Sequence, residues 1–201
     1  PVAGAVRTAR RHKKLLKLRP ALIGAAKMDI TPVTPIRMAG YGGRRKESEG
    51  VADPIFARAL VIGGPRKFTK DEFAWKKTSE FMGSGQGLLL EPDMSIVVSV
   101  ENCGVPDALT NRLCEELARR FGVARQRIAV CSTHSHSAPW LREFSPLHIS
   151  EVTPEQHKRL AQYEVELLDN MVKVVTKAVE TRRPGKLAWG TTNLNFAINR
   201  R

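Results

Sequence analysis

The stretch between residues 95 and 131 constrains the fold more than any other part of this 201-residue chain. It begins at 95–100 with a β-branched run, S-I-V-V-S-V, that predicts a strand. Pro106 then opens a helix, and Gly122 is placed to end it. The apolar stripe of this helix recurs every four residues, at Leu109, Leu113, Leu117 and Phe121. A second apolar strand at 128–131 follows after a short joint, so the stretch predicts a βαβ crossover with two parallel strands.

Three further strands are expected around this unit. Residues 21–25 read as a small-residue strand, and residues 55–62 read I-F-A-R-A-L-V-I. The one charge in the second run, Arg58, must lie on an exposed face or be paired inside a site. Residues 186–190 are predicted to form the last strand, after Pro184 stops the preceding helix.

A second long helix is predicted between Thr153 and about Arg182. The segment T-P-E-Q at its start is a capping box with proline at the first helical position. The side chains expected to face the core are Leu160, Leu167, Met171, Val174 and Ala178. The pattern as a whole predicts an α/β fold, a mixed sheet with a βαβ crossover and two long helices.

The chain divides by composition into a leader and one domain. Residues 1–20 are basic and are predicted to form a flexible leader, with an amphipathic helix on an anionic surface as the alternative. Residues 21–201 have the size of a single domain. Within them, residues 65–92 mix basic residues with glycines and are expected to form a long mobile excursion.

The charge balance is strongly basic, with 33 Lys and Arg against 20 Asp and Glu and a net charge of +13. Such a balance favours contact with nucleic acid, anionic lipid or acidic polymers. No clustered basic-aromatic recognition motif accompanies the basic residues. Nucleic acid is therefore not the expected partner, whereas an anionic membrane surface stays open.

Cysteine usage and hydropathy exclude two further classes. The three cysteines form no C-x-x-C pair and are predicted to be buried thiols: Cys103, Cys114 and Cys131. No apolar stretch reaches the roughly 18 residues that a membrane span needs. Neither a disulfide framework nor a membrane-spanning helix is expected.

The candidate chemistry lies where the strand 128–131 ends, in the segment S-T-H-S-H-S. Side chains at i and i+2 of an extended backbone point to the same side, so His134 and His136 can converge on one point. That point can hold a divalent metal or an anionic intermediate, or the pair can simply cap the strand end. Neutral imidazole suits zinc, but a catalytic zinc usually takes three or more protein ligands.

Other polar residues are expected near this pair. Glu101 ends the neighbouring parallel strand and should emerge beside His134, at the edge of the sheet where ligands bind. His148 is either a third ligand or an exposed loop histidine. The segment M-A-G-Y-G-G-R-R at 38–45 contains three glycines and either frames a pocket or is a plain connector.

Several segments occur together in an order that is typical of one family. They are G-A-A-K-M-D-I-T-P at 24–32, M-A-G-Y-G at 38–42, A-R-A at 57–59, V-V-S-V-E at 97–101, T-H-S-H-S at 133–137 with Pro139, and I-N-R at 198–200. In these segments the chain resembles the catalytic domain of the neutral/alkaline non-lysosomal ceramidases, over residues 23–201. The resemblance implies a zinc-dependent amidase that cleaves the N-acyl bond of ceramide to give sphingosine and a fatty acid.

The resemblance also implies roles for particular residues. His134 would be a zinc ligand, His136 would lie beside the reacting carbonyl, and Arg200 would reach the active site. The family's other zinc ligands (a second His, a Glu and a Tyr) and its serine lie beyond the segment at 198–200, where this sequence stops. The expectation is an incomplete catalytic domain, its N-terminal portion, inactive by itself. The chain departs from the family at A-P-W (138–140), where glycines are more frequent, and in its longer excursion at 65–92.

Two other functions compete with this interpretation. The chain can be a non-catalytic, degenerate domain that binds anionic membranes or nucleic acid through its basic surface. It can also belong to another class of metal-dependent amidohydrolase, in which the His-x-His motif stands on an early barrel strand. Two strands and a helix precede the motif here, which disfavours that third possibility. Family members are often secreted or membrane-associated, but no signal peptide is visible in residues 1–21.

Overall fold

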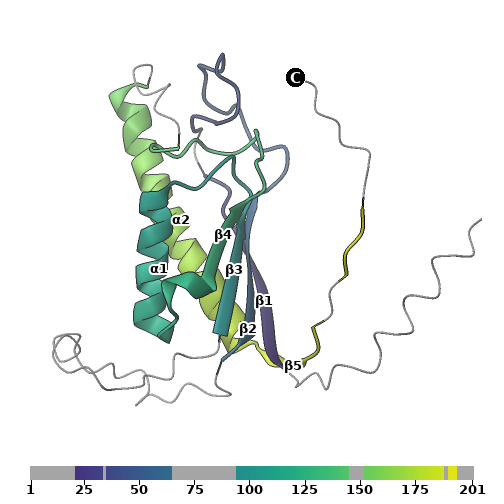
Figure 1. Cartoon of the computed structure of the whole chain (residues 1–201). Helices are drawn as coiled ribbons and strands as arrows, with labels where there is room; N and C mark the ends of the chain where they lie inside the picture. The colour runs from purple at the N-terminus through teal and green to yellow at the C-terminus, as the bar shows by residue number, and fades with distance from the viewer. Residues whose placement is uncertain (1–20, 34, 65–93, 145–151, 188–189, 194–201) are drawn as a thin grey trace, which may run out of the picture.

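The computed structural model describes residues 21–33, 35–64, 94–144, 152–187 and 190–193. Its centre is a five-stranded sheet with the strand order β4-β3-β2-β1-β5, and both helices lie on one face of it (Figure 1). The elements are β1 (Ala21–Asp29), β2 (Phe56–Gly63), β3 (Met94–Val100), α1 (Asp107–Phe121), β4 (Ile128–Ser132), α2 (Pro154–Glu180) and β5 (Arg183–Gly185). Only β3 and β4 are parallel, and the other neighbours are antiparallel. The predicted α/β fold with a mixed sheet is confirmed.

The βαβ crossover is formed by β3, α1 and β4. Gly122 ends α1 in the left-handed conformation, with φ 64°, and its N–H donates to the Ala118 carbonyl. The parallel pairing aligns Val98 with Val130. Beyond the last pair, the Thr133 N–H donates to the Val100 carbonyl at 3.0 Å. The carboxyl ends of β3 and β4 therefore emerge side by side, as the sequence predicts.

The core lies between the sheet and the helices. Alternate residues of β3, from Met94 to Val100, are at most 1% exposed and face α1 and α2. The five side chains predicted to face the core from α2 are all fully buried. On the opposite face of the sheet, Leu60 and Val97 are each 37% exposed. Within the described residues, no helix is apolar over a length that would cross a bilayer.

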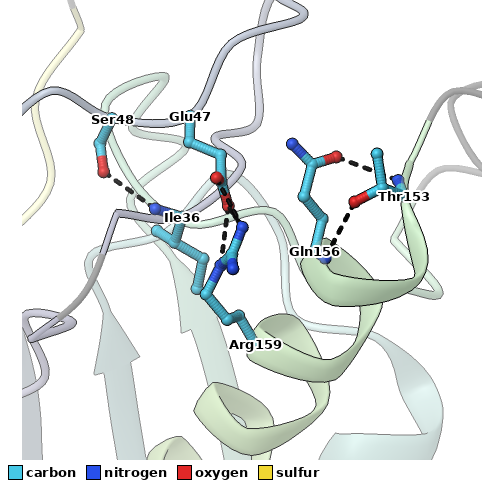
Figure 2. Close-up of polar contacts among 6 residues, drawn as sticks. All are labelled: Ile36, Glu47, Ser48, Thr153, Gln156 and Arg159. Atoms are coloured by element: carbon cyan, nitrogen blue, oxygen red, sulfur yellow. Dashed lines mark hydrogen bonds and ion pairs between the residues drawn. The ribbon is translucent and has the colours of Figure 1, made fainter.

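One ion pair, between Arg159 and Glu47, holds residues 36–48 against the start of α2, as Figure 2 shows. Arg159 of α2 donates from Nε and Nη2 to Glu47, with distances of 2.6–3.0 Å. The Ser48 hydroxyl accepts from the Ile36 N–H at 3.1 Å. Beside them, the predicted capping box of Thr153 and Gln156 is present in both directions. The segment before β2 is thereby anchored to the helix layer.

Some expectations about single elements were wrong. Among the described residues the last strand is β5 at 183–185, which includes Pro184; residues 186, 187 and 190 of the predicted strand are not in a strand, and 188–189 lie outside the described residues. A proline is tolerated there because β5 is an edge strand that pairs only with β1. Cys131 is exposed, unlike the buried Cys103 and Cys114, because its side chain lies on the helix-free face of the sheet.

The structure also bears on the predictions for Arg58 and for the first strand, whereas two predicted segments lie outside the described residues. Arg58 lies on the exposed face, which was the first of its two predicted alternatives, and there it forms an ion pair with Glu101 at 2.5 Å. The first strand extends to Asp29, four residues further than predicted. The leader at 1–20 and the excursion at 65–92 lie outside the described residues.

The packing of α2 gives a test of the core. Leu167 is fully buried, so Leu167→Ala leaves a cavity and should lower the free energy of unfolding by about 2–5 kcal/mol. Val165, on the same helix, is 58% exposed, and Val165→Ala should change that free energy by less than about 0.5 kcal/mol. Urea unfolding followed by circular dichroism measures both. Equal losses in the two variants would contradict the burial of α2.

Candidate metal centre

The two histidines lie directly after the carboxyl end of β4, and their rings converge. The Nε2 atoms of His134 and His136 are 3.3 Å apart, and the ring centroids are 4.9 Å apart. The convergence predicted from their spacing is therefore confirmed. The prediction assumed an extended backbone, and that assumption was wrong, because His134 has φ 62°, in the left-handed region. A non-glycine residue in that region is strained, and such strain is commonest at functional sites.

A backbone carbonyl fixes the orientation and the tautomer of His134. Its Nδ1 lies 2.8 Å from the carbonyl oxygen of Cys103, in the turn that follows β3. A carbonyl only accepts, so Nδ1 must carry the proton. In neutral imidazole the lone pair is then on Nε2, which is the atom that faces His136. Metal-binding histidines are commonly oriented in this way.

The separation of the two Nε2 atoms fits a shared zinc ion. Two nitrogens bound at about 2.0–2.1 Å to a tetrahedral zinc lie about 3.3–3.4 Å apart. The observed separation is 3.3 Å. The separation therefore fits two ligands along one edge of a zinc tetrahedron, so the residues present fit half of such a site.

Cys103 completes the only group of three metal-ligating side chains in the described chain, with ligand atoms of Cys103, His134 and His136 all within 4.8 Å. Its Sγ is 3.8 Å from Nδ1 of His134, on the edge of the ring away from the Nε2 pair. Burial raises the pKa of the Cys103 thiol, which favours its neutral form. We therefore infer that Cys103 orients His134 through its backbone carbonyl, and we do not assign its thiol as a metal ligand.

The segment at 37–44 frames a pocket over His136, so the interpretation as a plain connector was wrong. Met38 bridges Pro139, and the Ala39 N–H donates to the Ala138 carbonyl at 3.0 Å. Gly40 has φ 101°, and a Cβ added there would lie 2.3 Å from Cγ of His136. Only glycine lets this backbone approach the imidazole so closely.

Two side chains of the segment at 37–44, those of Tyr41 and Arg44, contact His136 and hold the segment against it. The ring of Tyr41 lies edge-on to that of His136, with centroids 5.0 Å apart and planes at 85°. Arg44 donates from Nη1 to the carbonyls of His136 at 2.8 Å and Ala39 at 3.0 Å. Its guanidinium also lies 4.9 Å from the centre of the Tyr41 ring. The cavity enclosed by these loops has a volume of about 260 Å³.

Of the other predicted site residues, only Glu101 lies among the described residues, and its carboxylate does not contact the histidine pair. The Glu101 carboxylate accepts from the Phe56 N–H and from Arg58, so it serves the sheet edge, while Cys103 is the residue that contacts His134. Arg200 and His148 lie outside the described residues. The sequence signal for Cys103 was its position three residues beyond β3, whose carboxyl end adjoins that of β4.

The fold and the site define an α/β domain with a candidate two-histidine metal centre at the carboxyl edge of a parallel strand pair. No protein-family model matches the sequence. Among solved structures, the chain is similar to neutral ceramidase from Pseudomonas aeruginosa, with a TM-score of 0.57 over 85% of this chain and 18% identity. It is also similar to a ceramidase complexed with C2, with a TM-score of 0.57 over 83% of this chain and 18% identity.

These likenesses confirm the ceramidase resemblance at the level of the fold. The chain covers 23% of the length of the first ceramidase chain and 22% of the second. The chain thus matches less than a quarter of the length of either ceramidase.

The close approach of Gly40 to His136 gives a test of the site. Gly40→Ala should lower the free energy of unfolding by about 1–3 kcal/mol, because alanine is strained at φ 101°. The new Cβ should also displace the imidazole, which would shift the His136 signals in NMR spectra. Gly43→Ala is the control, because nothing lies within 4 Å of a Cβ there. Unchanged His136 signals in Gly40→Ala would contradict the contact.

Proposed function

We propose that this chain is part of a zinc-dependent amide hydrolase of the neutral ceramidase type. The reaction is the cleavage of an N-acyl sphingoid lipid to a fatty acid and a sphingoid base. The observation that carries the proposal is the pair of Nε2 atoms, 3.3 Å apart, at the sheet edge of a fold shared with neutral ceramidase. This separation is suited to zinc, and zinc hydrolases use imidazole ligands.

Each residue has a chemical role in this proposal. His134 would bind a zinc ion through Nε2, and the Cys103 carbonyl holds the ring in the tautomer that this requires. A zinc ion bound there would supply polarisation of the amide carbonyl and a lowered pKa of a bound water. His136 is proposed to lie beside the reacting carbonyl, as the resemblance implies, with its Nε2 3.3 Å from that of His134. Arg200 is proposed to reach the active site, as the resemblance implies.

The described part of the chain holds only part of a catalytic site. A catalytic zinc usually has three protein ligands and one open position. The described residues offer two Nε2 atoms on one side of His134 and the Cys103 thiol on the other. We propose that the longer protein supplies the remaining ligands and that the 201-residue chain alone does not hydrolyse lipids.

The hydrolase proposal is tested in a longer protein that continues beyond residue 201. That protein should bind zinc and release fatty acid from an N-acylsphingosine, and His134→Ala should lower the rate by about a hundredfold or more, because zinc contributes several kcal/mol to the transition state. Chelation should have the same effect, with recovery on adding zinc. His157→Ala, on α2, is the control and should retain the rate.

Two results would contradict this proposal in different ways. A longer protein that binds zinc and yet releases no fatty acid would refute the hydrolase. Tight, stoichiometric zinc in the 201-residue chain would refute only its incompleteness.

The net charge of +13 favours a second candidate function, a non-catalytic domain that binds anionic membranes or nucleic acid. Binding of this kind is electrostatic and weakens steeply as salt is added. Under this alternative, His134→Ala would leave binding to anionic vesicles or DNA unchanged. No hydrolysis would then be expected from the longer protein.

A further inference from the structure

A fully buried asparagine lies beside the turn that orients His134. Asn102 is the second residue after β3, and it is 0% exposed. Its Nδ2 donates to the Pro139 carbonyl at 2.9 Å, and its Oδ1 accepts from the Gly104 N–H at 3.2 Å. A polar side chain is costly to bury unless its groups are paired, and both ends of this amide are paired.

The bond to Gly104 fixes the direction of the Cys103 carbonyl. The Gly104 N–H and the Cys103 carbonyl belong to one peptide group, which is planar and trans, so they point in opposite directions. Asn102 binds the N–H side of this group. Nδ1 of His134 donates to the oxygen on the other side at 2.8 Å. The peptide group therefore cannot turn over without breaking both hydrogen bonds.

Pro139 gives the Asn102 amide a fixed anchor. The residues on either side of it, Ala138 and Trp140, form backbone hydrogen bonds of 3.0 and 2.8 Å with the segment at 37–39. The carbonyl that accepts from Asn102 thus belongs to a backbone stretch that is itself held by hydrogen bonds on both sides. Asn102 joins this stretch to the turn after β3.

The residue type suits this position. The Pro139 carbonyl only accepts and the Gly104 N–H only donates, so the side chain between them must offer one donor and one acceptor. An amide offers both, whereas an ionised carboxylate offers no donor. Leucine has nearly the same shape as asparagine and offers neither, which makes it the sharpest substitution.

We propose that Asn102 is a positioning residue of the metal centre, which acts through the Cys103 carbonyl to keep Nε2 of His134 free for a metal. The hydrogen bonds form a continuous series from Asn102 through the peptide group of Gly104 to His134. In a protein interior, successive hydrogen bonds of this kind polarise one another. The effect on zinc rests on the proposed function, whereas the effect on the tautomer does not.

The first test uses the 201-residue chain with excess chelator, so that it depends on neither zinc nor hydrolysis. NMR spectra of isotope-labelled histidine, recorded at about pH 8 where imidazole is neutral, distinguish its two tautomers. The unchanged chain should show His134 with its proton on Nδ1. Asn102→Leu removes both hydrogen bonds of the side chain, so the His134 signals should shift towards those of a mixture of tautomers.

Two control variants separate positioning from a general loss of stability. Leu167→Ala leaves a cavity under α2, and its His134 signals should stay as in the unchanged chain. Asn111→Leu makes the same substitution at an exposed position of α1 and should also leave them in place.

The second test measures zinc binding in the longer protein by competition with a zinc-binding dye. Asn102→Leu should weaken zinc binding by about tenfold or more, because the loss of groups that orient a metal-binding histidine typically costs about 10–100-fold in affinity. Asn111→Leu should bind zinc as the unchanged longer protein does.

Three results would overturn the proposal. They are unchanged His134 signals in a folded Asn102→Leu, the same shift of those signals in Leu167→Ala, and unchanged zinc affinity of Asn102→Leu in a longer protein that binds zinc. A longer protein that binds no zinc would refute the proposed function and leave the effect of Asn102 on the tautomer intact.

If Asn102→Leu does not fold, the unchanged chain decides. The side-chain N–H protons of Asn102 should exchange with water at least about tenfold more slowly than those of the exposed Asn111. Equal exchange rates, or a His134 that carries its proton on Nε2, would overturn the proposal.

Discussion

The hydrogen bond from Nδ1 of His134 to the Cys103 carbonyl is the contact on which the candidate site depends. It joins the turn after β3 to the turn after β4, across 31 residues of sequence. The parallel pairing of the two strands brings these turns together, and the Thr133 N–H continues that pairing by one bond. Because the carbonyl can only accept, this contact also decides which nitrogen of His134 keeps a lone pair. The crossover thus fixes the chemistry of the ring as well as the core.

His136 is held by a different part of the chain. Arg44 and Gly40 contact it from a segment more than 90 residues earlier, and that segment is anchored to α2 through Glu47 and Arg159. The direction of its Nε2 therefore depends on loop packing, whereas that of His134 depends on strand pairing. Two independent supports converge on one pair of nitrogens, which is the arrangement expected of a preorganised site.

The sequence predicted the elements because their signals are local. Apolar periodicity placed α1, α2 and β3, and the capping box located the start of α2 to the residue. The convergence of the histidines followed from their spacing, but the left-handed backbone of His134 did not, since no neighbouring glycine or proline signals it. The Cys103 carbonyl was missed because a backbone acceptor has no residue type to recognise. The contact of Arg44 with His136 joins residues 92 apart in the sequence, and local sequence patterns do not indicate which residues so far apart will meet.

The charge of the cavity bears on any metal that the two histidines would hold. A divalent cation held by the two histidines would be repelled by the guanidinium of Arg44, which lines the same cavity. The described lining offers no acidic side chain to offset this repulsion. Under the proposed function, anionic ligands from the rest of a longer protein would offset that repulsion.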